Sequence, residues 1–103
     1  MACRLTPQAE ADLDQIWSYI FEQSGDMEIA RRQVASITDQ FVRLAKYPKM
    51  GRARDADLGP GRRSLSVGRY VIVYRLADHV KGADVLLLRV AHGSRDIEAL
   101  FKP

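Results

Sequence analysis

Arginine is the residue type with binding chemistry that is concentrated in one part of this chain. Residues 43–75 carry nine lysines and arginines against two aspartates, whereas residues 1–42 carry three basic residues against seven acidic ones. A basic segment of this kind predicts a partner of negative charge, either nucleic acid or an acidic protein surface. The alternative is a solvated face without a specific partner. The candidate partner-binding residues lie on or beside predicted strands: Arg62, Arg63, Arg69, Arg75, Arg89 and Arg95.

The histidines bear on acid–base chemistry and on metal binding. His92 ends a predicted strand, and histidine is the residue type suited to act as a base near neutral pH, whereas arginine stays protonated and is a poor base. A lone histidine at a strand end is more often a structural hydrogen-bonding residue than a catalytic one, and both interpretations stay open. His79 falls in a polar loop. With one cysteine, Cys3, and two separated histidines, the sequence supports no metal site, and no cofactor is expected.

The bulk composition is that of an ordinary globular chain. Its 103 residues fit one domain, expected to span 1–103, with 47% hydrophobic and 28% charged residues. A single cysteine cannot form an internal disulfide, so the fold needs no oxidising compartment. The N-terminus lacks the apolar run of a signal peptide, and the longest apolar run, at 85–88, is far too short for a membrane span. We expect a cytoplasmic protein without a membrane partner.

The first half of the chain is patterned as two helices after a short strand at 2–5. Thr6 and Pro7 suit a helix cap and first helical position, and Gly25 suits the C-terminal end. Apolar residues recur there at steps of three and four, which predicts an amphipathic helix. A second such stripe predicts a helix over 26–45. Because the connection is short, the two helices should form an antiparallel hairpin.

The second half is patterned as three strands. We expect a loop over 49–61, strands over 62–67 and 70–76 joined at Gly68-Arg69, a polar loop over 77–83, and a central apolar strand over 84–92. Tyr70 and Tyr74 then share one strand face, where they either contact a partner or pack in the core. A short helix at 94–101 with Ser94 as its cap completes an α+β fold. Its helical hairpin packs on one face of a small, mainly antiparallel sheet.

Three stretches in this order resemble one family. They are LTPQAEADLDQIWSYI at 5–20, LAKYPKMGRARDADLGPGRRSLSVGRYVIVYRL at 44–76 and LRVAHGSRDIEALF at 88–101. Together they span almost the whole chain and resemble the ParE/RelE toxin superfamily. Within that superfamily, their short sequence motifs are most similar to those of ParE proteins. The resemblance implies the toxin of a type II toxin–antitoxin system, of the kind that stabilises plasmids or chromosomal segments. It further implies DNA gyrase as the target, a ParD-like antitoxin that neutralises the toxin, and contact with operator DNA only through that antitoxin.

The resemblance leaves two alternatives. RelE-type toxins cleave messenger RNA in the ribosome, a reaction that needs a base, an acid and positive charge on the phosphate. Tyr74 and His92 are the candidate functional residues for that case, but Lys46 and Lys49 lie outside the predicted sheet, and no tyrosine follows Leu76. This departure favours a binding protein, with the six arginines facing target or antitoxin. The other alternative is a relic toxin that acts with its antitoxin as a DNA-binding co-repressor.

Overall fold

The computed structural model describes residues 3–76 and 85–101. The predicted loop at 77–83, with His79, lies outside the described residues. In the described ranges the elements are, in order, β1 (Cys3–Leu5), α1 (Pro7–Ser24), α2 (Met27–Lys46), β2 (Arg52–Ala53), α3 (Asp55–Leu58), β3 (Arg62–Val67), β4 (Tyr70–Leu76), β5 (Val85–His92) and the 3-10 helix η1 (Glu98–Phe101). None of the described helices combines the length and apolar character needed to cross a bilayer.

The helical hairpin begins and ends where its capping residues predict. The Thr6 hydroxyl accepts a hydrogen bond from the Ala9 amide at 3.1 Å, and Pro7 is the first helical residue. Gly25 ends α1 with φ of 67°, a left-handed conformation that favours glycine. Asp26, expected inside the second helix, is its cap and accepts from the amides of Glu28 and Ile29.

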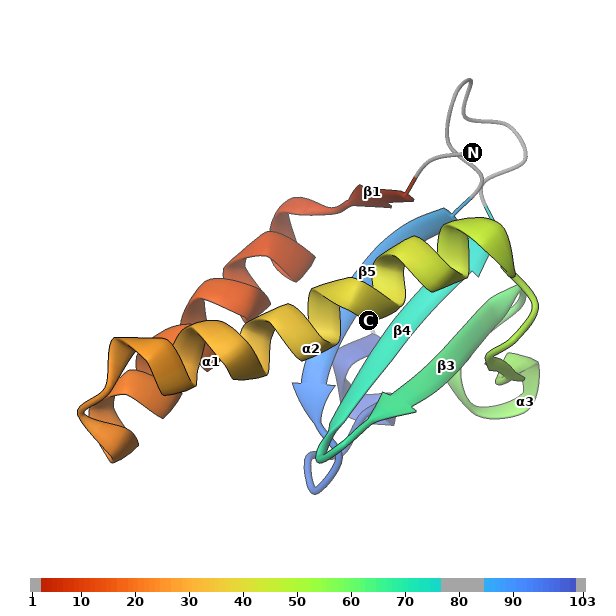
Figure 1. Ribbon diagram of the computed structural model, residues 1–103. Helices are drawn as coiled ribbons and strands as arrows, with labels where there is room; N and C mark the ends of the chain where they lie inside the picture. The colour runs from red at the N-terminus through yellow and green to blue at the C-terminus, as the bar shows by residue number, and fades with distance from the viewer. Residues whose placement is uncertain (1–2, 77–84, 102–103) are drawn as a thin grey trace.

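The five strands form one sheet in the order β1-β5-β4-β3-β2. Only β1 and β5 pair in parallel; the other pairs are antiparallel, and β5 is an interior strand as its apolar run predicts. Helices α1 and α2 cover one face of the sheet, and the closed end of their hairpin extends past the sheet (Figure 1). The principal core lies between these layers and includes Ile16, Ile37, Ile72 and Leu87.

The opposite face of the sheet carries a second, smaller apolar cluster of Leu58, Val73, Ala91 and Ile97. Its cover comes from α3 and η1. The expectation of an unstructured loop over 49–61 is therefore wrong, because that stretch contains β2 and α3. Both elements are too short to produce a periodic signal in the sequence.

The C-terminal segment also differs from the expected helix over 94–101. Only the single 3-10 turn η1 forms there. Ser94 does not cap it, because the Ser94 amide and hydroxyl turn back to His92. The Asp96 carboxylate accepts from the Ala99 amide at 3.3 Å instead. Ile97 of this segment is buried in the smaller cluster. The segment is therefore held in place by packing rather than by the helix propensity of its residues.

A β-bulge interrupts the pairing of β4 with β5. Val73 lies opposite Arg89, but the next residue, Tyr74, lies opposite Leu87, so the β5 strand carries one extra residue. As a result, Leu87 and Val90 both face the helices, although they are three residues apart. The bulge reverses the alternation of side chains along the rest of β5.

Candidate binding surfaces

The six candidate arginines do not form one surface. Arg69 precedes β4, and Arg75 lies near the other end of that strand. At about 3.4 Å per residue, their Cα atoms are about 20 Å apart. Arg95 lies near Arg69, whereas Arg62 and Arg63 begin β3 and lie near Arg75. The arginines therefore divide between the two ends of the sheet.

A broad open groove of about 1130 Å³ lies at the end of the sheet that carries the β3–β4 turn. Its walls come from α1, the first half of α2, the turn itself and the end of β5. We call it the hairpin groove. The residues that define its chemistry are Tyr19, Arg69, Tyr70, His92 and Arg95.

Aromatic groups form the inner part of the hairpin groove. The Tyr70 and His92 rings meet edge to face, with centroids 5.5 Å apart. Burial raises the pKa of the Tyr70 hydroxyl, and the nearby Tyr19 raises it further, so Tyr70 stays protonated at neutral pH. Tyr19 is 59% exposed. The groove thus offers an aromatic floor with cationic side chains at its rim.

His92 reaches the groove because of the bulge in β5. Its Nδ1 atom lies 2.7 Å from the Ser94 hydroxyl and accepts a hydrogen bond from the Ser94 amide at 3.1 Å. The ring therefore stabilises the turn after β5, which is the structural role left open by the sequence. Its neighbour in the groove is Tyr70 rather than Tyr74.

Arg89 is used inside the fold and adds no free charge to either surface. Its Nε and Nη2 atoms donate to both carboxylate oxygens of Asp12 on α1, at 2.8 and 3.0 Å. The same carboxylate accepts from the Val90 amide at 2.9 Å. Asp12 is only 6% exposed. This bidentate ion pair anchors α1 to the bulge, and hydrogen bonding to Asp12 raises the pKa of Arg89.

Tyr74 lies in the core with no exposed surface. Its hydroxyl donates to the Pro48 carbonyl at 2.8 Å and accepts from the Gly51 amide at 2.9 Å. Opposite it, Arg63 donates to the carbonyls of Lys49 and Gly51 at 3.0 and 2.7 Å. Both side chains hold the segment that follows α2 against the sheet. Because the Tyr74 hydroxyl is buried and hydrogen-bonded, a substrate cannot reach it.

The second cationic surface lies at the end of the sheet opposite the hairpin groove. Arg62 and Arg75 are directly opposed across β3 and β4. The Arg62 guanidinium donates to the Leu58 carbonyl and lies 4.6 Å from the Phe101 ring centroid, whereas Arg75 is exposed. We call this surface the basic end. It comprises Arg4, Lys46, Lys49, Arg52, Arg62, Arg63 and Arg75.

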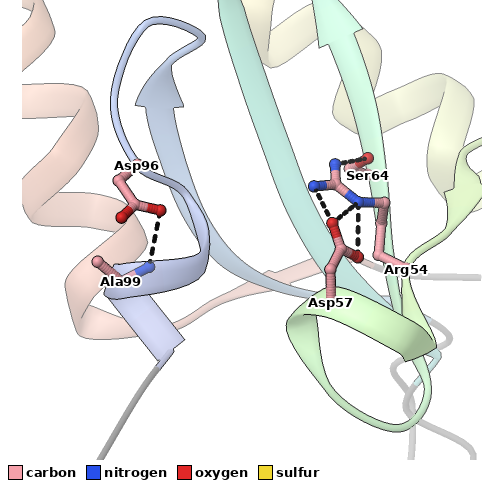
Figure 2. A network of polar contacts seen from close by, with 5 residues as sticks. All are labelled: Arg54, Asp57, Ser64, Asp96 and Ala99. Carbon is pink, nitrogen blue, oxygen red and sulfur yellow. Dashed lines mark hydrogen bonds and ion pairs between the residues drawn. The ribbon is translucent and has the colours of Figure 1, made fainter.

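One arginine near the basic end is neutralised within the fold. Arg54 forms an ion pair with Asp57 at 2.6 Å and donates to the Ser64 hydroxyl at 3.0 Å, a network shown in Figure 2. The interaction raises the pKa of Arg54 and lowers that of the Asp57 carboxyl. The network fastens α3 to the sheet, beside the segment that holds Asp96.

Two residues of these sites were not singled out from the sequence, although each left a signal. Asp12 stands between Ala9 and Ile16 at helical spacing, so a carboxylate interrupts an apolar stripe and requires a buried partner. Tyr19 is an aromatic residue outside that stripe, which is typical of a contact surface. Among residues 3–76 and 85–101, no group of three or more His, Cys, Asp or Glu side chains is placed to hold a metal ion.

Comparison with known proteins gives one consistent result. Residues 3–97 match the family model described as the ParE toxin of the type II toxin–antitoxin system parDE. Toxin ParE3 of Caulobacter vibrioides is 35% identical over 94 residues, covering 91% of this chain and 88% of that protein. Toxin ParE1 of Mycobacterium tuberculosis is 30% identical and covers 91% of each chain.

Two solved structures share the fold. The chromosomal ParDE toxin–antitoxin system from P. aeruginosa contains a chain with a TM-score of 0.72 and 29% identity, covering 89% of this chain and 95% of that one. The toxin–antitoxin complex RelBE2 from Mycobacterium tuberculosis contains a chain with a TM-score of 0.63 and 24% identity, covering 88% and 95%. The expected α+β fold is thereby confirmed.

Proposed function

Because this chain belongs to the ParE toxin family of type II toxin–antitoxin systems, we propose that it inhibits DNA gyrase by binding and is neutralised by a ParD-like antitoxin. The observation that carries the proposal is the family match over residues 3–97, which covers both the helical hairpin and the sheet. The toxin then acts through its surfaces, without a covalent step.

The distribution of candidate catalytic groups supports a binding mechanism. Cleavage of RNA requires a base, an acid and phosphate-binding cations within reach of one phosphate. His92 lies in the hairpin groove, whereas Arg62 and Arg75 lie about 20 Å away along β4. Tyr74 is buried and its hydroxyl is engaged by backbone groups. Of the six candidate arginines, Arg69 and Arg95 line the groove with His92.

The hairpin groove is the proposed site of the antitoxin. It lies between the helical hairpin and the sheet, so a segment bound there contacts both layers at once. The aromatic floor suits apolar side chains of a peptide, and Arg69 and Arg95 suit acidic side chains at its edges. Salt should therefore weaken the complex only in part, because apolar burial is not screened.

The test of the target is a DNA supercoiling assay with purified gyrase. The toxin should inhibit supercoiling or accumulate cleaved gyrase–DNA complexes, and a His92→Gln variant should inhibit equally well. In parallel, toe-printing on translating ribosomes should show no cuts in the message. Absence of any effect on gyrase at large excess, together with cuts that His92→Gln abolishes, would establish the ribonuclease alternative instead.

The test of the antitoxin site uses matched charge reversals. Arg69→Glu with Arg95→Glu should weaken binding of the ParD-like protein encoded beside the toxin, because both side chains lie at the rim of the groove. Lys49→Glu with Arg75→Glu removes the same charge from the other end of the sheet and should leave binding nearly unchanged. If both double variants weakened antitoxin binding equally, the hairpin groove would not be the antitoxin site.

A further inference from the structure

Strand register places three arginines in one row across the sheet. Arg4 pairs with Leu86, Leu86 with Arg75, and Arg75 with Arg62. The neighbours of Arg4, Cys3 and Leu5, pack toward the helices, so the row lies on the opposite face. Because adjacent strands are about 4.8 Å apart, the row spans about 15 Å.

The charges of this row are not neutralised within the described part of the fold. The ion pairs there engage other arginines, namely Arg31, Arg54 and Arg89. Like charges directly opposite one another destabilise a sheet, which is the arrangement of Arg62 and Arg75. A bound anion would relieve this repulsion.

Among the residues that the structure describes, Asp55 places a carboxylate beside this row. It lines a small hollow of about 290 Å³ together with Arg63 and Arg75. Its Oδ1 atom accepts a hydrogen bond from the Gly61 amide at 3.0 Å. It forms no ion pair within 4 Å among the residues that the structure describes. Among residues 3–76 and 85–101, no ion pair therefore offsets the positive charge of Arg4, Arg62 or Arg75.

Further cations extend the row around the end of the sheet. Arg52 on β2 lies opposite Ser64 of β3, two residues along from Arg62. Lys49 is held beside the sheet because its carbonyl accepts from Arg63. These supports are backbone pairings and hydrogen bonds, so the cations are presented from fixed positions rather than from a free loop.

We infer that the basic end binds the phosphate backbone of duplex DNA. Arg4, Arg52 and Arg75 are exposed, and guanidinium groups match phosphate geometry. Arg62 and Arg63 are half-buried beside them. Protein partners usually meet an apolar or aromatic centre. Among the described residues, the exposed large apolar side chains are Tyr19, Phe21, Met27, Val42 and Tyr47. Of these, Tyr47 borders the basic end beside Lys46, and the row of arginines itself holds none of them. Interfaces with DNA are polar and positively charged, as this surface is.

The charge distribution also orients the bound molecule. Helix α1 exposes Glu10, Asp14 and Glu22 and has no basic residue, so DNA repels it. The hairpin groove opens at the far end of the sheet, which leaves the basic end free when the groove is filled. This departs from the expectation that operator DNA is contacted only through the antitoxin, since the toxin itself adds phosphate contacts that carry no sequence information.

The experiment is fluorescence anisotropy of a labelled mixed-sequence duplex of about 20 base pairs, titrated with the purified chain between about 50 and 200 mM salt. With about four phosphate contacts, the slope of log K against log salt is about −3.6, a loss of roughly 150-fold over this range. The assay contains no gyrase, so its outcome is separate from that of the proposed inhibition.

Matched triple variants locate the contact. Arg4→Gln/Arg52→Gln/Arg75→Gln removes three phosphate contacts and should abolish most DNA binding. The slope of log K against log salt should become less negative by about 2.7. Arg32→Gln/Arg69→Gln/Arg95→Gln removes the same charge elsewhere and should retain the slope of the original chain. All six side chains are exposed, and circular dichroism checks that both variants fold.

Two results would overturn the inference. One is equal loss of DNA binding in both triple variants, which would mean that overall charge alone attracts the duplex. The other is binding of labelled polyglutamate to the basic end with no binding of DNA, which would identify an acidic protein as the partner of this surface.

Discussion

Replacement of Asp12 by alanine should be among the most destabilising single changes in this protein. The carboxylate accepts three hydrogen bonds, two from Arg89 and one from the Val90 amide. The side chains of Asp12 and Arg89 are 7% and 20% exposed, so water replaces these partners poorly. Asp12→Ala leaves a half-buried guanidinium and a buried amide unpaired.

The expected magnitude follows from these contacts. Removal of one partner of a buried ion pair costs about 3–5 kcal/mol, because the remaining charge is uncompensated. Partial exposure of Arg89 favours the lower end, about 3 kcal/mol. Domains of this size unfold with a free energy of about 5–15 kcal/mol, so the loss is a large share of the total.

Urea unfolding followed by circular dichroism measures this loss. The double variant Asp12→Ala/Arg89→Ala should be less destabilised than the sum of its single changes, since it removes the orphaned charge as well. Glu28→Ala, which breaks the exposed pair with Arg31, is the matched control and should leave the midpoint unchanged. A loss below about 1 kcal/mol for Asp12→Ala would refute the reasoning.

Three further changes test other parts of the fold. Tyr74→Phe removes a donor to the Pro48 carbonyl and leaves the buried Gly51 amide unpaired, so it should cost about 2 kcal/mol in urea unfolding; an unchanged midpoint would contradict the buried network. Gly51→Ala should cost about 1–3 kcal/mol, because its Cβ would meet the Tyr74 hydroxyl and a backbone carbonyl at 2.8 Å; thermal melting that matches the original chain would count against this packing. Arg54 lowers the pKa of the Asp57 carboxyl from its ordinary 3.8, so the pair stabilises the folded state above that pH and loses its effect as pH falls through the lowered value. The stability difference between Asp57→Asn and the original chain should therefore be present at neutral pH and disappear in acid, and a difference independent of pH would show that the pair contributes no charge-dependent stability.

Much of the fold could be predicted because local signals agree with it. Thr6, Pro7 and Gly25 mark the bounds of α1, and the glycine at 68 marks the turn between β3 and β4. The apolar run of β5 predicts an interior strand, and it is one. In these segments, capping, turn chemistry and apolar periodicity all favour the same structure.

The candidate sites were harder to predict because they depend on register. The extra residue in β5 reverses the alternation of the residues that follow it and so turns His92 to the groove, and no local pattern marks such a bulge. The sequence groups the six arginines as one set of candidate binding residues, whereas β4 separates Arg69 from Arg75 by its own length. The short elements β2 and α3 were missed because packing on the sheet, rather than propensity, stabilises them.

The pairing of β1 with β5 has a consequence for synthesis of the chain. These strands are adjacent in space, but Leu5 and Val85 are separated by nearly the whole sequence. A nascent chain that has not yet reached Val85 lacks the strand between β1 and β4, so the sheet cannot close and the helices lack the apolar surface that Val85, Leu87 and Val90 supply. A message cut short, or a ribosome that stops early, therefore releases fragments that cannot fold. Both the hairpin groove and the row of arginines form only after β5 has been translated.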